Sequence, residues 1–70
     1  MEENPVITLN GAPHSLPASS TVLTLLRSLG LADIPVLVEH NTLALFPREF
    51  PDTPLGAGDR VEIIRIVAGG

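Results

Sequence analysis

A chain of 70 residues without a single cysteine has to fold by packing aliphatic side chains. Domains of this size bury a modest share of their surface, and many add disulfides or thiolate-bound metals to gain stability. Neither addition is open to a chain that has no thiol. The composition supports the remaining route, because 44% of the residues are hydrophobic and only Phe46 and Phe50 are aromatic. We therefore expect one small domain with a core of Leu, Val and Ile.

The charge pattern argues against several classes of partner. The formal net charge is −4, the four basic residues are scattered arginines, and there is no Trp or Tyr to stack on bases. Nucleic-acid binding is not expected, because it needs clustered positive charge. His14 and His40 lie far apart in sequence and do not suggest a metal site. The acidic first residues and the lack of a long apolar stretch predict a cytoplasmic protein that does not act at a membrane.

The first elements are a hairpin and a helix. Residues 6–9 predict a strand that ends at Asn10-Gly11, a favoured centre of a two-residue hairpin turn, and residues 14–17 are expected to return as the second strand. A helix should follow the candidate N-caps at residues 19–21 and end at Gly30. Its apolar stripe has helical spacing and consists of Val22, Leu25, Leu26 and Leu29.

The rest of the chain reads as strands and turns. Residues 36–40 and 60–67 predict two further strands, and the second of them is the more strongly β-branched. Between them, residues 41–54 are expected to be irregular with a short edge strand near 43–45, and residues 56–59 form a turn. A hairpin followed by one helix and more strands predicts an α+β domain of the β-grasp (ubiquitin-like) type. We expect a mixed four- to five-stranded sheet over residues 1–67 and a flexible Ala-Gly-Gly tail over residues 68–70.

The two terminal glycines are the clearest chemical feature. Gly69 and Gly70 directly follow the last predicted strand, and two glycines extend the chain without side chains. Such a tail can enter a narrow channel of another enzyme. The terminal carboxylate has an ordinary pKa of about 3.5 and is ionised at neutral pH, so it is a poor electrophile. A partner would have to activate it, most simply as an acyl-adenylate made from ATP, before a sulfur nucleophile displaces AMP and leaves a thiocarboxylate on Gly70.

Strand alternation predicts where partners bind. Val61 and Ile63 should face the helix, which turns Ile64 and Ile66 to the other side. On the third strand Leu37 should also point outward. We expect these three apolar side chains to form an exposed patch beside the tail, with Arg65 at its rim, that docks the activating enzyme. The alternative is that the loop of residues 41–54 folds over them.

A series of short motifs runs along essentially the whole chain: residues 7–11, Thr21-Val22 with Leu25-Leu26, residues 36–41, residues 47–49, residues 58–64 and residues 67–70. In their order and spacing the sequence resembles the ThiS family of sulfur carriers, and the Gly-Gly ending is the most specific of the motifs. Two positions depart from the family pattern: the turn at Asn41-Thr42 lacks a glycine that is often found there, and Phe50 stands where larger aromatics are common.

The resemblance implies a carrier that is a co-substrate of other enzymes and is not itself an enzyme. A ThiF-like adenylyltransferase would activate Gly70 with ATP and Mg, so that no cofactor is bound by the carrier. A cysteine desulfurase or sulfurtransferase would supply the sulfur, and a ThiG-like thiazole synthase would accept it for thiazole phosphate synthesis in thiamine biosynthesis.

Three alternatives are open at this point. The small subunit of molybdopterin synthase is also a β-grasp carrier that ends in Gly-Gly, but its members tend to be longer and to carry Pro-Pro before the tail, which Ile66-Val67-Ala68 lacks. A non-covalent β-grasp binding module would have a dispensable tail. A ubiquitin-like protein tag is the third.

Overall fold

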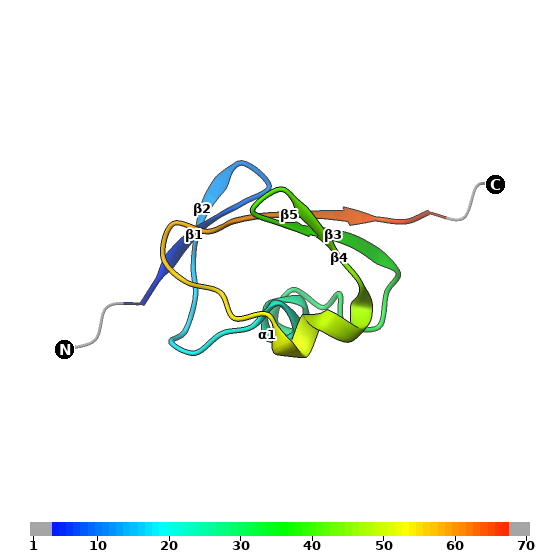
Figure 1. The fold of residues 1–70 in the computed structure, drawn as a ribbon, viewed down its shortest axis with the longest axis horizontal. Helices are drawn as coiled ribbons and strands as arrows, with labels where there is room; N and C mark the ends of the chain where they lie inside the picture. Colours follow the sequence, from blue (N-terminus) through cyan, green and yellow to red (C-terminus); the bar gives the residue numbers. More distant parts are fainter. Residues whose placement is uncertain (1–3, 68–70) are drawn as a thin grey trace.

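The computed structural model describes residues 4–67, and within them a five-stranded sheet carries one α-helix on one of its faces (Figure 1). The strands lie in the order β2-β1-β5-β3-β4. β1 and β5 pair in parallel, and the other neighbours are antiparallel. This mixed sheet with a single main helix confirms the predicted β-grasp fold. The strands are β1 (Val6–Leu9), β2 (Ala12–Ser15), β3 (Val36–His40), β4 (Leu43–Leu45) and β5 (Arg60–Arg65).

The first hairpin closes on the predicted Asn-Gly turn. Asn10 and Gly11 have φ values of 48° and 85°, and Leu9 pairs with Ala12 across the turn. These positive φ values are those of a type I′ turn, which returns the chain after two residues. The second strand therefore begins two residues earlier than the sequence predicted, and it ends at Ser15.

Local hydrogen bonds cap both ends of the helix α1 (Val22–Ser28). Thr21 is the N-cap: its hydroxyl accepts from the Thr24 N–H, and the Thr24 hydroxyl accepts from the Thr21 N–H in return. At the other end Gly30 has φ 74°, and the Gly30 and Leu31 N–H groups donate to helix carbonyls. This pairing is a Schellman motif, so the predicted stop at Gly30 is confirmed.

Loss of the N-cap should lower the stability of the domain. Thr21→Ala removes the hydroxyl that accepts the Thr24 N–H, and such changes typically lower the free energy of unfolding by about 1 kcal/mol. Thr21→Ser keeps the acceptor and should stay close to the parent. Urea unfolding followed by circular dichroism measures both, and equal midpoints for the Ala and Ser variants would show that the cap contributes nothing.

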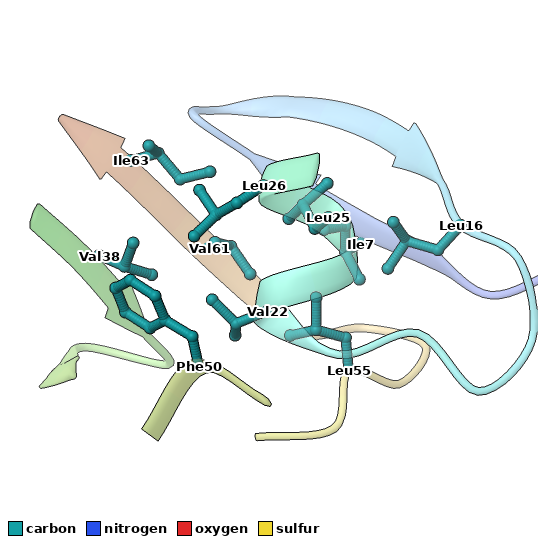
Figure 2. Packing of buried hydrophobic residues seen from close by; sticks show 10 residues of the cluster. All are labelled: Ile7, Leu16, Val22, Leu25, Leu26, Val38, Phe50, Leu55, Val61 and Ile63. Carbon is teal, nitrogen blue, oxygen red and sulfur yellow. The ribbon is translucent and has the colours of Figure 1, made fainter. Parts of the chain in front are cut away.

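The core lies between the sheet and α1 (Figure 2). Val61 and Ile63 of β5 are 0% and 8% exposed and face the helix, as the strand alternation predicted. Leu29 was expected in the helix stripe, but it is the C-cap residue and is 37% exposed, because the helix ends before its side chain reaches the sheet. The buried hydrophobic residues are Ile7, Leu16, Val22, Leu25, Leu26, Val38, Phe50, Leu55, Val61 and Ile63.

The segment expected to be irregular contains a 3-10 helix at Pro47–Asp52. Pro47 stands at its start, where the missing N–H costs nothing, and the Glu49 carboxylate accepts the Phe46 N–H. The helix packs against α1 and inserts Phe50 into the core. The segment therefore closes the helix side of the domain, next to α1, while the short edge strand β4 lies where the sequence placed it.

The last strand is shorter than predicted. β5 ends at Arg65, although the Ile66 N–H still donates to the Pro35 carbonyl across the sheet. The predicted flexible tail of residues 68–70 lies outside the described residues. Between residues 4 and 67, no helix has the length and apolar character needed to cross a membrane.

Candidate functional site

The strand that leads to the C-terminus is the middle strand of the sheet. β5 pairs with β3 over five residue pairs, from His40↔Val61 to Val36↔Arg65. On its other side β1 pairs only with Arg60 and Val61. Beyond β1, the Asn10 side chain accepts the Ile63 N–H and donates to the Ile63 carbonyl. β5 is thus held on both sides as far as Ile63, which fixes the direction in which the chain leaves the domain (Figure 1).

Leu37, Ile64 and Ile66 lie exposed on the sheet, as the sequence predicted. Leu37 and Ile64 are direct cross-strand partners, so their side chains share one face, and they are 40% and 55% exposed. Ile66 is 57% exposed. The alternative, in which the loop of residues 41–54 covers them, is wrong, because all three side chains stay at least 40% exposed and the 3-10 helix of that loop packs on α1.

Phe46 belongs to the same surface, and the sequence reasoning missed it. Its ring is 60% exposed, and it lines a groove of ≈ 320 Å³ together with Leu37 and Ile66. The Arg48 guanidinium lies 4.6 Å from the centre of the ring. The signal in the sequence was an aromatic residue just before a proline-rich turn, next to a predicted edge strand. We call Leu37, Phe46, Ile64 and Ile66 the outer patch.

Ile66 and Arg65 mark the end of the sheet nearest the C-terminus. Ile66 also lines a second groove of ≈ 500 Å³, formed with the loop after α1 and with the 3-10 helix. Arg65 is exposed and pairs with Val36, whose side chain packs against the core, so the two residues share the helix side of the sheet. The predicted rim position of Arg65 is thus on the face opposite Leu37 and Ile64.

The outer face becomes acidic away from the C-terminus. Glu39 and Glu62 are direct cross-strand partners in the row next to Leu37 and Ile64. Like charges in this arrangement repel each other. Within residues 4–67 neither carboxylate has a salt bridge. The outer face therefore offers a partner an apolar end near the tail and a negative end farther away.

A polar cluster around Asp59 connects the turns at the end of the sheet farthest from the C-terminus. The Asp59 carboxylate lies 2.9 Å from His40 Nε2 and accepts from the Gly56 N–H and the Asn41 amide. The side-chain oxygen Oδ1 of Asn41 in turn accepts the Arg60 N–H. The Gly56 hydrogen bond, followed by the bond with His40, lowers the pKa of Asp59 below its ordinary value of 3.8. The cluster joins the β3–β4 turn to the start of β5 and has a structural role.

The Asp59 cluster should make the domain sensitive to acid. Because the pKa of Asp59 is lower in the folded state, its carboxylate stabilises the fold fully above about pH 3.8, and this stabilisation is lost as the pH falls through the lowered pKa. Asp59→Asn should lower the unfolding temperature at neutral pH and flatten its fall below pH 3.8. Thermal unfolding between pH 2 and 7 tests this, and an identical slope in both proteins would contradict it.

The other predicted site residues cannot be placed. Ala68, Gly69 and Gly70, with the carboxylate that the sequence predicts to be the acceptor, lie outside the described residues. Over residues 4–67 there is no group of three or more His, Cys, Asp or Glu side chains able to hold a metal ion. The described part of the site is therefore a strand that leads to the tail and the outer patch beside it.

Comparison with known proteins identifies relatives that share this fold. The ThiS family model matches residues 7–70. The sulfur carrier protein ThiS of Thermus thermophilus is 35% identical over 65 residues, which are 93% of this chain and all of that protein. A thiazole synthase of Magnetococcus marinus is 34% identical over 64 residues, which are 91% of this chain, but the chain spans only 20% of that protein's length.

Solved structures give the same result. The crystal structure of the thiamine biosynthesis protein ThiS from Geobacter metallireducens has a TM-score of 0.78 at 34% identity, covering 93% of this chain and 99% of that one. The solution structure of a thiamine biosynthesis protein from Geobacter metallireducens has a TM-score of 0.75 at 34% identity, covering 93% of this chain and 87% of that one. A family match from residue 7 to residue 70, with similarity in sequence and in structure over 93% of the chain, shows that this chain belongs to the ThiS family.

Proposed function

We propose that this ThiS-family chain, a sulfur carrier of thiamine biosynthesis, holds its sulfur as a thiocarboxylate on Gly70. The observation that carries the proposal is the family match, which runs through the Gly-Gly terminus. The geometry of the described residues supports it. β5 is the middle strand of the sheet, and it directs the chain toward its C-terminus beside the outer patch.

The chemistry requires an activating partner. A carboxylate with a pKa near 3.5 carries a negative charge at neutral pH, and sulfur nucleophiles do not attack it. A ThiF-like adenylyltransferase would use ATP and Mg to form an acyl-adenylate on Gly70 with release of pyrophosphate. The outer sulfur of a persulfide on a cysteine desulfurase or sulfurtransferase would then displace AMP, and a thiol would reduce the resulting acyl disulfide to the thiocarboxylate. The carrier supplies the substrate carboxyl group and no acid or base, so we propose that it is a co-substrate and not an enzyme. The need for ATP supports a cytoplasmic location.

A thiazole synthase is the proposed acceptor of the sulfur. The Magnetococcus marinus protein named thiazole synthase contains a segment that resembles this chain, and its remaining four fifths lie outside the similarity. Carriers and acceptors that work together are at times joined in one polypeptide, so this arrangement supports a ThiG-like partner.

The outer patch is the proposed docking site for the adenylyltransferase. Exposed apolar patches on small proteins mark contact surfaces, and Leu37, Ile64 and Ile66 are all at least 40% exposed. Phe46 extends the surface, and the grooves on both sides of Ile66 could accept side chains of the partner. A contact at this place would bring the tail to the enzyme.

Genetic complementation distinguishes a sulfur carrier of thiamine biosynthesis from the small subunit of molybdopterin synthase. We expect the gene to restore thiamine-free growth to a bacterial strain that lacks its own ThiS carrier. It should not restore molybdoenzyme activity to a strain that lacks the small subunit of molybdopterin synthase. A gene truncated by the Gly70 codon is the control and should fail in the first strain. Rescue of the molybdopterin strain alone would contradict the proposal.

A further inference from the structure

One edge of β5 is open beyond the point where β1 ends. In a strand, the backbone N–H and C=O groups of successive residues point to opposite neighbouring strands. In β5, the backbone groups of the odd-numbered residues point toward β1. The Asp59 and Val61 carbonyls accept from Thr8 and Asn10, whereas the Ile66 N–H donates to Pro35 on the opposite side. The Asn10 side chain takes both backbone groups of Ile63. The next odd-numbered residue is Arg65, and no strand of the described sheet lies beside it.

The two outer edges of the sheet are protected, in contrast to this one. In β2, the backbone groups of Pro13 and Ser15 point away from β1 to the outer edge of the sheet, and Pro13 has no N–H that could pair with another strand. β4 is only three residues long, and the Phe46 N–H that follows it is taken by the Glu49 carboxylate. Short strands, prolines and occupied donors prevent unwanted strand pairing. Arg65 is an exposed residue five positions from the C-terminus, and none of these protections is found beside it in the described sheet.

We propose that an extended segment of the adenylating enzyme pairs with the open edge at Arg65, the last residue of β5, and at Val67 just beyond it, adding a strand that guides the tail to ATP. The inference rests on the proposed function and deepens it. The tail beyond Val67 is Ala68-Gly69-Gly70, which offers almost no side chain to a partner. Main-chain hydrogen bonds are then the means by which an enzyme can hold it in one direction.

The geometry suits the reaction that follows. An extended chain rises about 3.3 Å per residue, so a strand anchored at Val67 places the Gly70 carboxyl group roughly 10 Å farther along the same line. Acyl-adenylate formation needs the carboxylate in line with the α-phosphorus of ATP, and such positioning supplies much of the rate. The outer patch contributes contact area on one face of the sheet, while the open edge sets direction and register.

Backbone methylation tests the pairing without changing a side chain. The 70-residue chain contains no cysteine, so it can be made by ligating residues 1–56 to residues 57–70 through a temporary cysteine at Ala57, which desulfurisation then converts back to alanine. N-methyl-Arg65 and N-methyl-Val67 each remove a donor on the open edge. N-methyl-Ser15 is the matched control, because its N–H points outward from β2 at the far edge of the sheet.

Each synthetic protein is mixed with the ThiF-like adenylyltransferase and Mg-ATP, and ATP–pyrophosphate exchange gives an apparent KM. We expect the unmodified protein and N-methyl-Ser15 to agree within about twofold, and the two edge variants to have an apparent KM at least tenfold higher, which corresponds to about 1.4 kcal/mol. Circular dichroism should give the same spectrum for all four. In hydrogen exchange, the Arg65 and Val67 amides should become protected when the enzyme is added.

The outcomes separate the inference from the function. If the unmodified protein supports no exchange, the proposed function fails. If it does support exchange and the edge variants match it, strand pairing is wrong while the function stands. If analytical ultracentrifugation shows that the protein alone is a dimer, and hydrogen exchange shows that the two amides are already protected in it, the edge belongs to a second copy and the inference is overturned.

Discussion

Incubation of the protein with its adenylyltransferase, Mg-ATP, a persulfide donor and a thiol reductant should raise its intact mass by the difference between one sulfur and one oxygen atom. The terminal carboxyl group is the proposed acceptor: after its conversion to an acyl-adenylate, the outer sulfur of the persulfide displaces AMP, and the thiol reduces the resulting acyl disulfide to the thiocarboxylate. Mass spectrometry of the whole 70-residue chain resolves this shift, and fragmentation should place it on Gly70. Omission of ATP should leave the mass unchanged, because the free carboxylate is a poor electrophile.

Two variants make this expectation specific to the terminus. Deletion of Gly70 shortens the reach of the tail by one residue, about 3.5 Å, and should reduce conversion to background. Addition of one alanine after Gly70 adds a side chain and displaces the carboxyl group, and it should do the same. Both variants leave residues 4–67 unchanged, so they should unfold at the temperature of the parent. Full conversion of the extended variant would contradict a thiocarboxylate at Gly70.

The fold could be predicted where short segments determine their own structure. Asn10-Gly11 tolerates positive φ at both positions, so it fixed the first turn, and Gly30 stopped the helix for the same reason. The alternation of Val61 and Ile63 predicted which side of β5 is buried, because a strand has a period of two. The same alternation predicted that Leu37 and Ile64 share the exposed face of the sheet, and their cross-strand pairing confirms it.

The missed features depend on contacts between distant segments. The 3-10 helix lies in a stretch with three prolines, which reads as irregular, and it is held by the packing of Phe50 against α1 and the core. Phe46 is part of the outer patch because it follows β4 directly and lines a groove with Leu37 and Ile66, which come from distant parts of the chain. Asn10 was predicted as a turn residue, but its hydrogen bonds to Ile63, 53 positions away, could not be read from local pattern.

Replacement of Ile64 by glutamate should weaken docking of the adenylyltransferase while the domain stays folded. Ile64 is 55% exposed and next to Leu37, so the new carboxylate stays in water in the free protein. In the complex it would be buried against an apolar surface of the partner, and desolvation of an unpaired charge is costly. We expect the dissociation constant, measured by calorimetry, to rise by at least tenfold, or about 1.4 kcal/mol.

Two other glutamate substitutions separate docking from folding. Leu43 is 70% exposed, and its partner His40 places it on the face opposite Ile64, so Leu43→Glu should bind with the affinity of the parent. Val61 is 0% exposed and lies in the core, so Val61→Glu should unfold the domain. If Ile64→Glu is folded by circular dichroism and binds as tightly as Leu43→Glu, the enzyme does not contact the outer patch. A selective loss for Ile64→Glu would instead place the contact on the face of the sheet that leads directly to the C-terminal carboxyl group.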